Sequence, residues 1–288
     1  MVIFQRIIFI VFVVCISFNA NSQNSFNADA MFKHEQKLMV IGDSMINSHS
    51  SLTRQQASRD YIKAFRAALV EKGSYQYSFD SLKFMSRLAA PDNAFKLFTW
   101  ILKLPNNRYK YFGVIQVNNP DSLEIHPLFD RSQDFEPGSP EEELNSLERE
   151  FSITNNEDWN GAYYYDLGMV EKKKFLSKKS EKYYVLLGWD GNNGVSHKKV
   201  VDILTIDNGL PTFGQPIIKT QNGMQTRLVL ECNSNAVITL KYHDEEELIT
   251  FDLLVPKSDN NQGKYFTYIP SGQYDYLEWK RNKFYYRS

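Results

Sequence analysis

The stretch 95–130, FKLFTWILKLPNNRYKYFGVIQVNNPDSLEIHPLFD, decides the fold class of this chain. Its segments FKLFTWIL, YKYFGVIQV and LEIHPLFD are rich in aromatic and β-branched residues, which favour strands. The clusters PNNR and NNPDS that separate them are typical of turns. The stretch therefore predicts three consecutive antiparallel strands joined by short turns, a meander that we assign to residues 76–130.

Strand character returns C-terminal to residue 161. Seven further segments carry it: AYYYDLGMV, KYYVLLGWD, RLVLECN, AVITLKYH, LITFDLLV, KYFTYIP and YDYLEWKRNKFYYR. The spacing of these segments predicts a main antiparallel β region over 161–288 that forms one domain with the meander, as a meander, a sandwich or a partly open barrel. CNSNA, 232–236, is predicted to be a hairpin turn. One short helix is predicted in this region, with Ser196 as its N-cap and Val200, Ile203 and Leu204 on its buried side.

Residues 131–160 interrupt the strand pattern. They are acidic and contain Pro137, Gly138 and Pro140. We expect an exposed acidic linker, with a short helix beginning near Ser139.

Helical periodicity marks the segment 23–75, N-terminal to the meander. Two rows recur every seven residues, first Met31, Leu38, Met45 and Leu52, then Phe32, Met39 and Ile46. Together they predict one apolar helix face. A second helix is predicted from Ala57, Tyr61, Ala64, Phe65, Ala68 and Leu69. An antiparallel helical pair over about 28–72, packed on the β body, makes the predicted fold class α+β.

The first 22 residues have the order of a secretory signal peptide. Arg6 precedes an apolar run over 7–16, and small and polar residues follow. The run is shorter than the roughly 20 residues that span a bilayer. We expect cleavage after Ser22 and a protein exported to the periplasm or the medium. The alternative, a lipid anchor on Cys15, is disfavoured because Val14 is not a small residue.

Composition limits the classes of partner. The formal net charge is −1, so the chain has no overall positive charge with which to bind nucleic acid. No later segment is apolar enough to be a transmembrane helix. After cleavage Cys232 would be the sole cysteine, which allows no intramolecular disulfide.

Ser44, in the sequence GDS of residues 42–44, could be the nucleophile of a GDS-type esterase. Such an enzyme needs a D-x-x-H base near its C-terminus, whereas the last histidine here is His243, with no aspartate three residues before it. A serine without a base is a poor nucleophile. We therefore interpret Ser44 as a helical serine and predict no catalytic residues.

Three other motifs are candidates for ligand sites. GWDGNNG, 188–194, has Asp190, Asn192 and Gly194 at alternate positions, as in half a calcium loop, but a Gly/Asn turn explains it more simply. The five histidines show no metal-ligand spacing, so neither a metal site nor a cofactor is predicted. The basic run 171–182 is interpreted as a solubilising hairpin tip, with docking to an acidic glycan or a membrane surface as the alternative.

Aromatic strand residues are the remaining candidates for a ligand surface. Strand alternation would turn half of them outward, where they could stack on sugars or pack on a partner. The other interpretation is ordinary core and cross-strand packing. The candidates for a ligand surface are Tyr163, Tyr165, Tyr184, Trp189, Tyr276 and Trp279.

The segments YSFDSLKFMSRLAAPDNAFKLFTWIL, YKYFGVIQV, YYVLLGWDGNN, KKVVDILTI and ITFDLLVP resemble a family of secreted Bacteroidota proteins whose activity is uncharacterised. They span most of residues 75–256. The resemblance implies export in a Gram-negative bacterium and one continuous β-rich body. It implies no catalytic residue, cofactor or binding site.

The expected function follows from the export signal, the aromatic strands and the lack of a catalytic set. We expect a non-enzymatic accessory or binding protein outside the cytoplasm that presents a β surface to a glycan, a peptide or a cell-envelope protein. The alternative is a secreted hydrolase that uses carboxylates distant in sequence.

Overall fold

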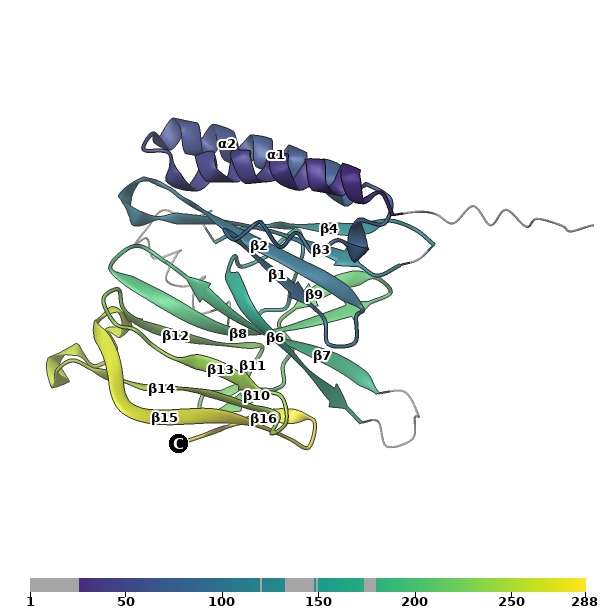
Figure 1. Ribbon diagram of the computed structural model, residues 1–288. Coiled ribbons are helices and arrows are strands. Elements are labelled where there is room, and N and C mark those ends of the chain that lie inside the picture. Colours follow the sequence, from purple (N-terminus) through teal and green to yellow (C-terminus); the bar gives the residue numbers. More distant parts are fainter. Residues whose placement is uncertain (1–25, 120, 133–147, 149, 174–179) are drawn as a thin grey trace, which may run out of the picture.

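A computed structural model describes residues 26–119, 121–132, 148, 150–173 and 180–288 (Figure 1). The predicted signal peptide, 1–22, and the helix predicted near Ser139 lie outside the described residues.

The N-terminal segment forms two helices, α1 (Ala28–Asn47) and α2 (Ser51–Leu69), which pack side by side (Figure 1). The predicted helical pair is therefore confirmed. In α2 all six residues of the predicted apolar face are buried: Ala57, Tyr61, Ala64, Phe65, Ala68 and Leu69.

The predicted apolar face of α1 is half wrong. Met31, Leu38 and Met45 of the first row are buried, but Leu52 of that row is an exposed residue of α2. All three residues of the second row, Phe32, Met39 and Ile46, are exposed. A helix that packs on a layer from one side buries a single stripe, and the second row lies one residue, about 100°, further round. Glu35 and Gly42 take the places in the stripe between the buried residues.

The strands form three sheets, none of which is closed. The N-terminal sheet is the antiparallel meander predicted from 95–130, with an additional edge strand. Its order is β1 (Met85–Ala89), β2 (Phe95–Lys103), β3 (Tyr109–Val117) and β4 (Glu124–Phe129).

The middle sheet has a long central strand, β8. Its order is β5 (Thr154–Asn155), β9 (Leu210–Phe213), β8 (Ser196–Asp207), β7 (Glu181–Asp190) and β6 (Tyr163–Lys172), and β12 (Arg227–Asn233) also pairs with β8. β6 and β7 pair up to Lys172 and Glu181, and residues 174–179 of the predicted lysine tip lie outside the described residues.

The C-terminal sheet inserts its last strand between earlier ones. Its order is β11 (Gly223–Gln225), β10 (Ile218–Thr220), β16 (Lys283–Arg287), β15 (Tyr268–Lys280), β14 (Leu248–Pro256) and β13 (Leu240–His243). β10 and β16 are parallel, and the other neighbours are antiparallel. Four short 3₁₀ helices complete the described elements: η1 (Ser74–Gln76), η2 (Pro105–Asn107), η3 (Asp259–Asn261) and η4 (Tyr265–Thr267).

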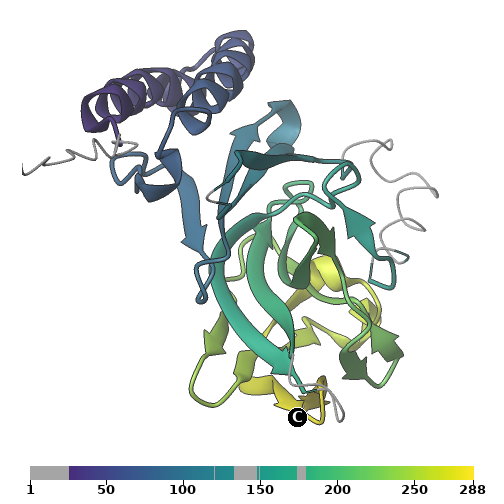
Figure 2. The same ribbon diagram turned by 90° about the vertical axis from the view of Figure 1, so that its right-hand side faces the viewer.

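The helical pair and the three sheets are stacked in four layers (Figures 1 and 2). One apolar cluster joins the helices to the N-terminal sheet, a second joins that sheet to the middle sheet, and a third joins the middle sheet to the C-terminal sheet. The first two sheets therefore have core residues on both faces. The C-terminal sheet buries one face and is the last layer of the stack.

The helix predicted from Ser196 is wrong, because this segment is the 12-residue strand β8. Val201 and Ile203 pack toward the C-terminal sheet, while Asp202 and Leu204 face the N-terminal sheet. A strand buried on both faces has a nearly continuous apolar run, which also satisfies helical spacing.

The hairpin predicted around CNSNA is also wrong. The chain does turn after Asn233, but β12 pairs with β8 and β13 pairs with β14, so the two strands belong to different sheets. A turn sequence specifies a change of direction, whereas strand pairing depends on long-range packing.

Candidate functional site

Ser44 lies in α1, as predicted from the sequence period. Its side chain is half-buried, and its hydroxyl donates to the Val40 carbonyl at 3.3 Å. This bond to the preceding turn is what an isolated helical serine makes. The position is not the strand-to-loop edge on which a serine nucleophile is held beside an oxyanion hole.

The GWDGNNG segment is a turn stabilised by its own side chains. Asp190 Oδ1 accepts hydrogen bonds from the Tyr111 hydroxyl at 2.7 Å and from the Asn192 amide at 2.8 Å. Asn193 Oδ1 accepts from the amides of Val195 and Ser196. These oxygens bind the chain itself, and no group of three metal-ligating side chains occurs within the described ranges.

Cys232 and His197 face each other across β12 and β8, a pairing that the sequence alone did not suggest. Cys232 Sγ lies 3.3 Å from His197 Nε2, which is also 2.8 Å from the Ala236 carbonyl oxygen. Cys232 is fully buried, and burial raises the pKa of its thiol to about 11. At neutral pH the sulfur is therefore a buried thiol, which is a weak nucleophile.

A buried ion pair lies between the N-terminal and middle sheets. Arg227 Nε is 3.4 Å from Asp202 Oδ1, and both side chains are 2 % exposed. The Tyr164 hydroxyl donates to Asp202 Oδ2 at 2.9 Å and accepts from Trp159 Nε1 at 3.3 Å. These groups are enclosed in the core, so we assign them a structural role.

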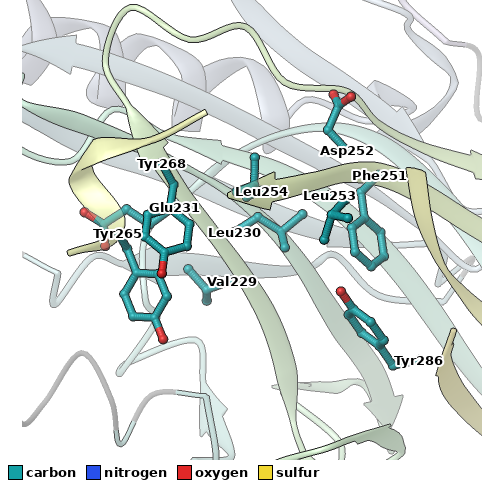
Figure 3. Close-up of a pocket in the computed structure, with 10 residues that line it drawn as sticks. All are labelled: Val229, Leu230, Glu231, Phe251, Asp252, Leu253, Leu254, Tyr265, Tyr268 and Tyr286. Carbon is teal, nitrogen blue, oxygen red and sulfur yellow. The ribbon is translucent and has the colours of Figure 1, made fainter. Parts of the chain in front are cut away.

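A cavity of about 170 Å³ opens between β12 and β14, next to η4 (Figure 3). Its lining is aliphatic and aromatic with two carboxylates: Val229, Leu230, Glu231, Phe251, Asp252, Leu253, Leu254, Tyr265, Tyr268 and Tyr286.

The two carboxylates of the cavity lie apart and bind other groups of the protein. Glu231 lies beside Tyr265 and Tyr268, whereas Asp252 is on the opposite side and points away (Figure 3). Glu231 Oε1 accepts from the Ser196 hydroxyl at 2.5 Å, and Asp252 Oδ2 accepts from the Thr239 amide at 2.6 Å.

The structure does not bring the six aromatic candidates onto one surface. Tyr184 is buried between the N-terminal and middle sheets, with its hydroxyl 3.0 Å from Asp92 Oδ2. Tyr165 and Trp279 pack against the core between the middle and C-terminal sheets.

Of the other three candidates, only Tyr276 is exposed. Trp189 makes an edge contact with Tyr109, with ring centroids 5.3 Å apart. Tyr163 is half-buried in β6. Tyr276 is exposed on β15.

Tyr276 belongs to an uncovered aromatic surface on the C-terminal sheet. Along β15, Asp275 and Leu277 point into the core, so Tyr274 and Tyr276 point outward, and they are 62 % and 37 % exposed. Tyr276 lies opposite Arg287 on β16. We call this the outer face, defined by the outward residues of β10, β13, β15 and β16. The alternation of inward and outward residues along this strand is a sequence signal that also indicates an outward position for Tyr274.

Comparison with family models, with curated proteins and with solved structures gave no match to this chain. In the part of the chain that the structure describes, neither helix combines the length and apolar character needed to cross a membrane.

Proposed function

We propose that this protein is an exported, non-enzymatic binding protein that presents the outer face of its C-terminal sheet to a glycan, a peptide or a protein of the cell envelope. The observation that carries the proposal is the exposure of Tyr274 and Tyr276 on the last layer of the stack. Exposed aromatic rings lose little conformational entropy on binding and offer a large contact area.

The proposal of export rests on the signal-peptide pattern of residues 1–22 and on the resemblance to secreted Bacteroidota proteins. Fractionation of the producing cells tests it, followed by N-terminal sequencing. We expect the mature chain in the periplasm or the medium, beginning at Gln23. A full-length chain in the cytoplasm would contradict export.

Binding is tested with the purified protein and the double variant Tyr274→Ala/Tyr276→Ala. Each is immobilised and exposed to the solubilised envelope of the producing cells, and the bound glycans, peptides and proteins are identified by mass spectrometry. The matched control is Phe32→Ala, which removes an aromatic ring that is 56 % exposed on α1. A ligand retained by the wild type and the control, but lost by the double variant, is the expected result. Equal retention by all three would refute the role of this face.

The second candidate is a secreted hydrolase, which rests on Glu231 and Asp252 as the two carboxylates of one cavity. Glycoside hydrolysis needs two carboxylates that flank the same bond, so Asp252 would have to turn toward Glu231 (Figure 3). The measurement is glycan cleavage by the wild type, by Glu231→Gln and by Asp252→Asn. Cleavage that both substitutions abolish, in variants that still fold, would establish the hydrolase and exclude the non-enzymatic function.

A further inference from the structure

Basic side chains lie beside two tyrosines of the outer face, Tyr285 and Tyr276. Lys219 Nζ, on the neighbouring strand, and Arg287 Cζ, two residues along β16, lie 5.9 and 5.4 Å from the centre of the Tyr285 ring. Lys219 pairs with Tyr285 across β10 and β16. Cations held this close to an aromatic face are attracted to it and so are positioned with the ring.

A second row repeats the arrangement two residues along. Thr250 lies between Lys241 and Tyr276, and Arg287 lies on the far side of Tyr276. Lys241 and Arg287 are exposed, because the neighbours of Lys241, Leu240 and Tyr242, point into the core. Tyr276 therefore has Arg287 as its neighbour on β16, with Thr250 on its other side. Tyr285 has Lys219 on one side and Glu278 on the other.

Two distant hairpins extend the basic surface at one end. The Lys173 amide donates to Asn282 Oδ1 at 3.0 Å, and Asn282 Nδ2 donates to the Lys173 carbonyl at 3.1 Å. This reciprocal pair fixes the end of the β6–β7 hairpin against the turn between β15 and β16. It brings exposed Lys173 next to a cluster made of Lys280, Arg281 and Lys283.

Acidic groups lie both within the outer face and at one edge of it. Glu278 is the outward carboxylate of β15, and it is 3.8 Å from Lys280 and 3.6 Å from Arg287. The acidic turn 244–247 borders β13 and β14, at the opposite edge of the sheet from β10. Negative charge at that edge favours an anion over β16 and β10, where Lys219, Lys283 and Arg287 are exposed.

We propose that the outer face binds an acidic polysaccharide whose sugar rings stack on Tyr274 and Tyr276 and whose carboxylates bind Lys219 and Arg287. The inference rests on the proposed function and specifies the ligand class of the same face. Exposed rings and cations therefore lie on the neighbouring strands β15, β16 and β10, which are about 4.8 Å apart. An extended chain with a ring and a charge in each unit can contact both kinds of side chain.

The probe is a polygalacturonate oligosaccharide, and its methyl ester of equal length is the neutral control ligand. Isothermal titration calorimetry measures both. We expect the acid form to bind at least about tenfold more tightly than the ester, since each charge-assisted contact adds to binding, and we expect added salt to weaken the acid form alone.

Two variants locate the site. Lys219→Gln/Arg287→Gln removes charge, and Tyr274→Ala/Tyr276→Ala removes the rings. All four side chains are exposed, so both variants should fold, which thermal melting monitored by circular dichroism checks. Each should weaken acid binding about tenfold. Lys33→Gln/Lys63→Gln, which removes two exposed cations from the helices, should have no effect.

Three results would overturn the inference and leave the proposed function standing. The first is equal affinity for the acid and the ester. The second is binding of the acid form that neither face variant weakens. The third is absence of binding to both oligosaccharides while the envelope ligand is still captured through Tyr274 and Tyr276. Tighter binding to phosphatidylserine-containing vesicles than to polygalacturonate would also overturn it, in favour of an anionic membrane surface. If the double tyrosine variant retains every envelope ligand, the proposed function itself fails.

Discussion

Asp202 and Arg227 form an ion pair across β8 and β12 in which each side chain is 2 % exposed. Breaking a buried pair from one side leaves an uncompensated charge in the core. We predict that Arg227→Met lowers the free energy of unfolding by about 3–5 kcal/mol, measured by urea denaturation.

The double variant Asp202→Asn/Arg227→Met is the control for this pair, because it removes both charges. It should be more stable than Arg227→Met alone. A double variant as unstable as the single one would show that the loss comes from packing of the arginine stem and not from the orphaned carboxylate.

Gly168 and Tyr242 form a close contact between the middle and C-terminal sheets. A Cβ atom at Gly168 would lie 1.9 Å from Tyr242 Cε1, so an alanine forces the ring out of its position. We predict that Gly168→Ala destabilises the protein by about 1–3 kcal/mol. In a Tyr242→Ala background the same change should cost close to nothing, and a double-mutant cycle measures the difference. Equal costs in both backgrounds would contradict the contact.

The buried thiol of Cys232 should make stability depend on pH in the alkaline range. Burial raises its pKa from 9.0 to about 11, so the native state holds this proton more tightly than the unfolded chain does. The stabilisation is complete below pH 9 and is lost as the pH rises from 9 through 11. A rise from 9.0 to about 11 corresponds to about 3 kcal/mol.

Cys232→Ala provides the comparison for the thiol. The difference in unfolding free energy between wild type and variant should shrink by about that amount between pH 8 and pH 11, because the tyrosines titrate alike in both proteins. Alkylation of the native thiol by iodoacetamide should be slow at pH 8 and fast after unfolding. Rapid alkylation of the native protein at pH 8 would contradict the buried, protonated state.

Ser44 should not react as a nucleophile. A fluorophosphonate probe is expected to leave the native protein unlabelled, and Ser44→Ala should change the free energy of unfolding by less than about 0.5 kcal/mol, since the site is a helix surface. Labelling of the wild type that disappears in Ser44→Ala would establish a serine hydrolase.

Local signals in the sequence were sufficient for the helical pair and the meander. Ala57, Tyr61 and Phe65 repeat with the helical period and are buried as predicted, because an amphipathic helix needs only one partner layer. The turn clusters between β2, β3 and β4 fix neighbours that are adjacent in sequence.

Features that depend on long-range packing could not be predicted from the sequence. β8 was mistaken for a helix because a strand with a core on each face loses its alternation. The placement of Tyr184 inside the core and Tyr276 outside it depends on which sheet covers each strand, and no local pattern encodes that. The contact between Cys232 and His197 likewise depends on the register of β12 against β8.

The position of β16 constrains how the chain can fold during synthesis. β10 pairs in parallel with β16, which follows β11 to β15 in the sequence, so the C-terminal sheet cannot be completed until β16 has emerged from the ribosome. Until then β10 and β15 lack their shared neighbour and leave backbone groups unpaired. The C-terminal sheet is therefore the last of the three described sheets that can be completed, and until then its open strand edges can pair with other chains.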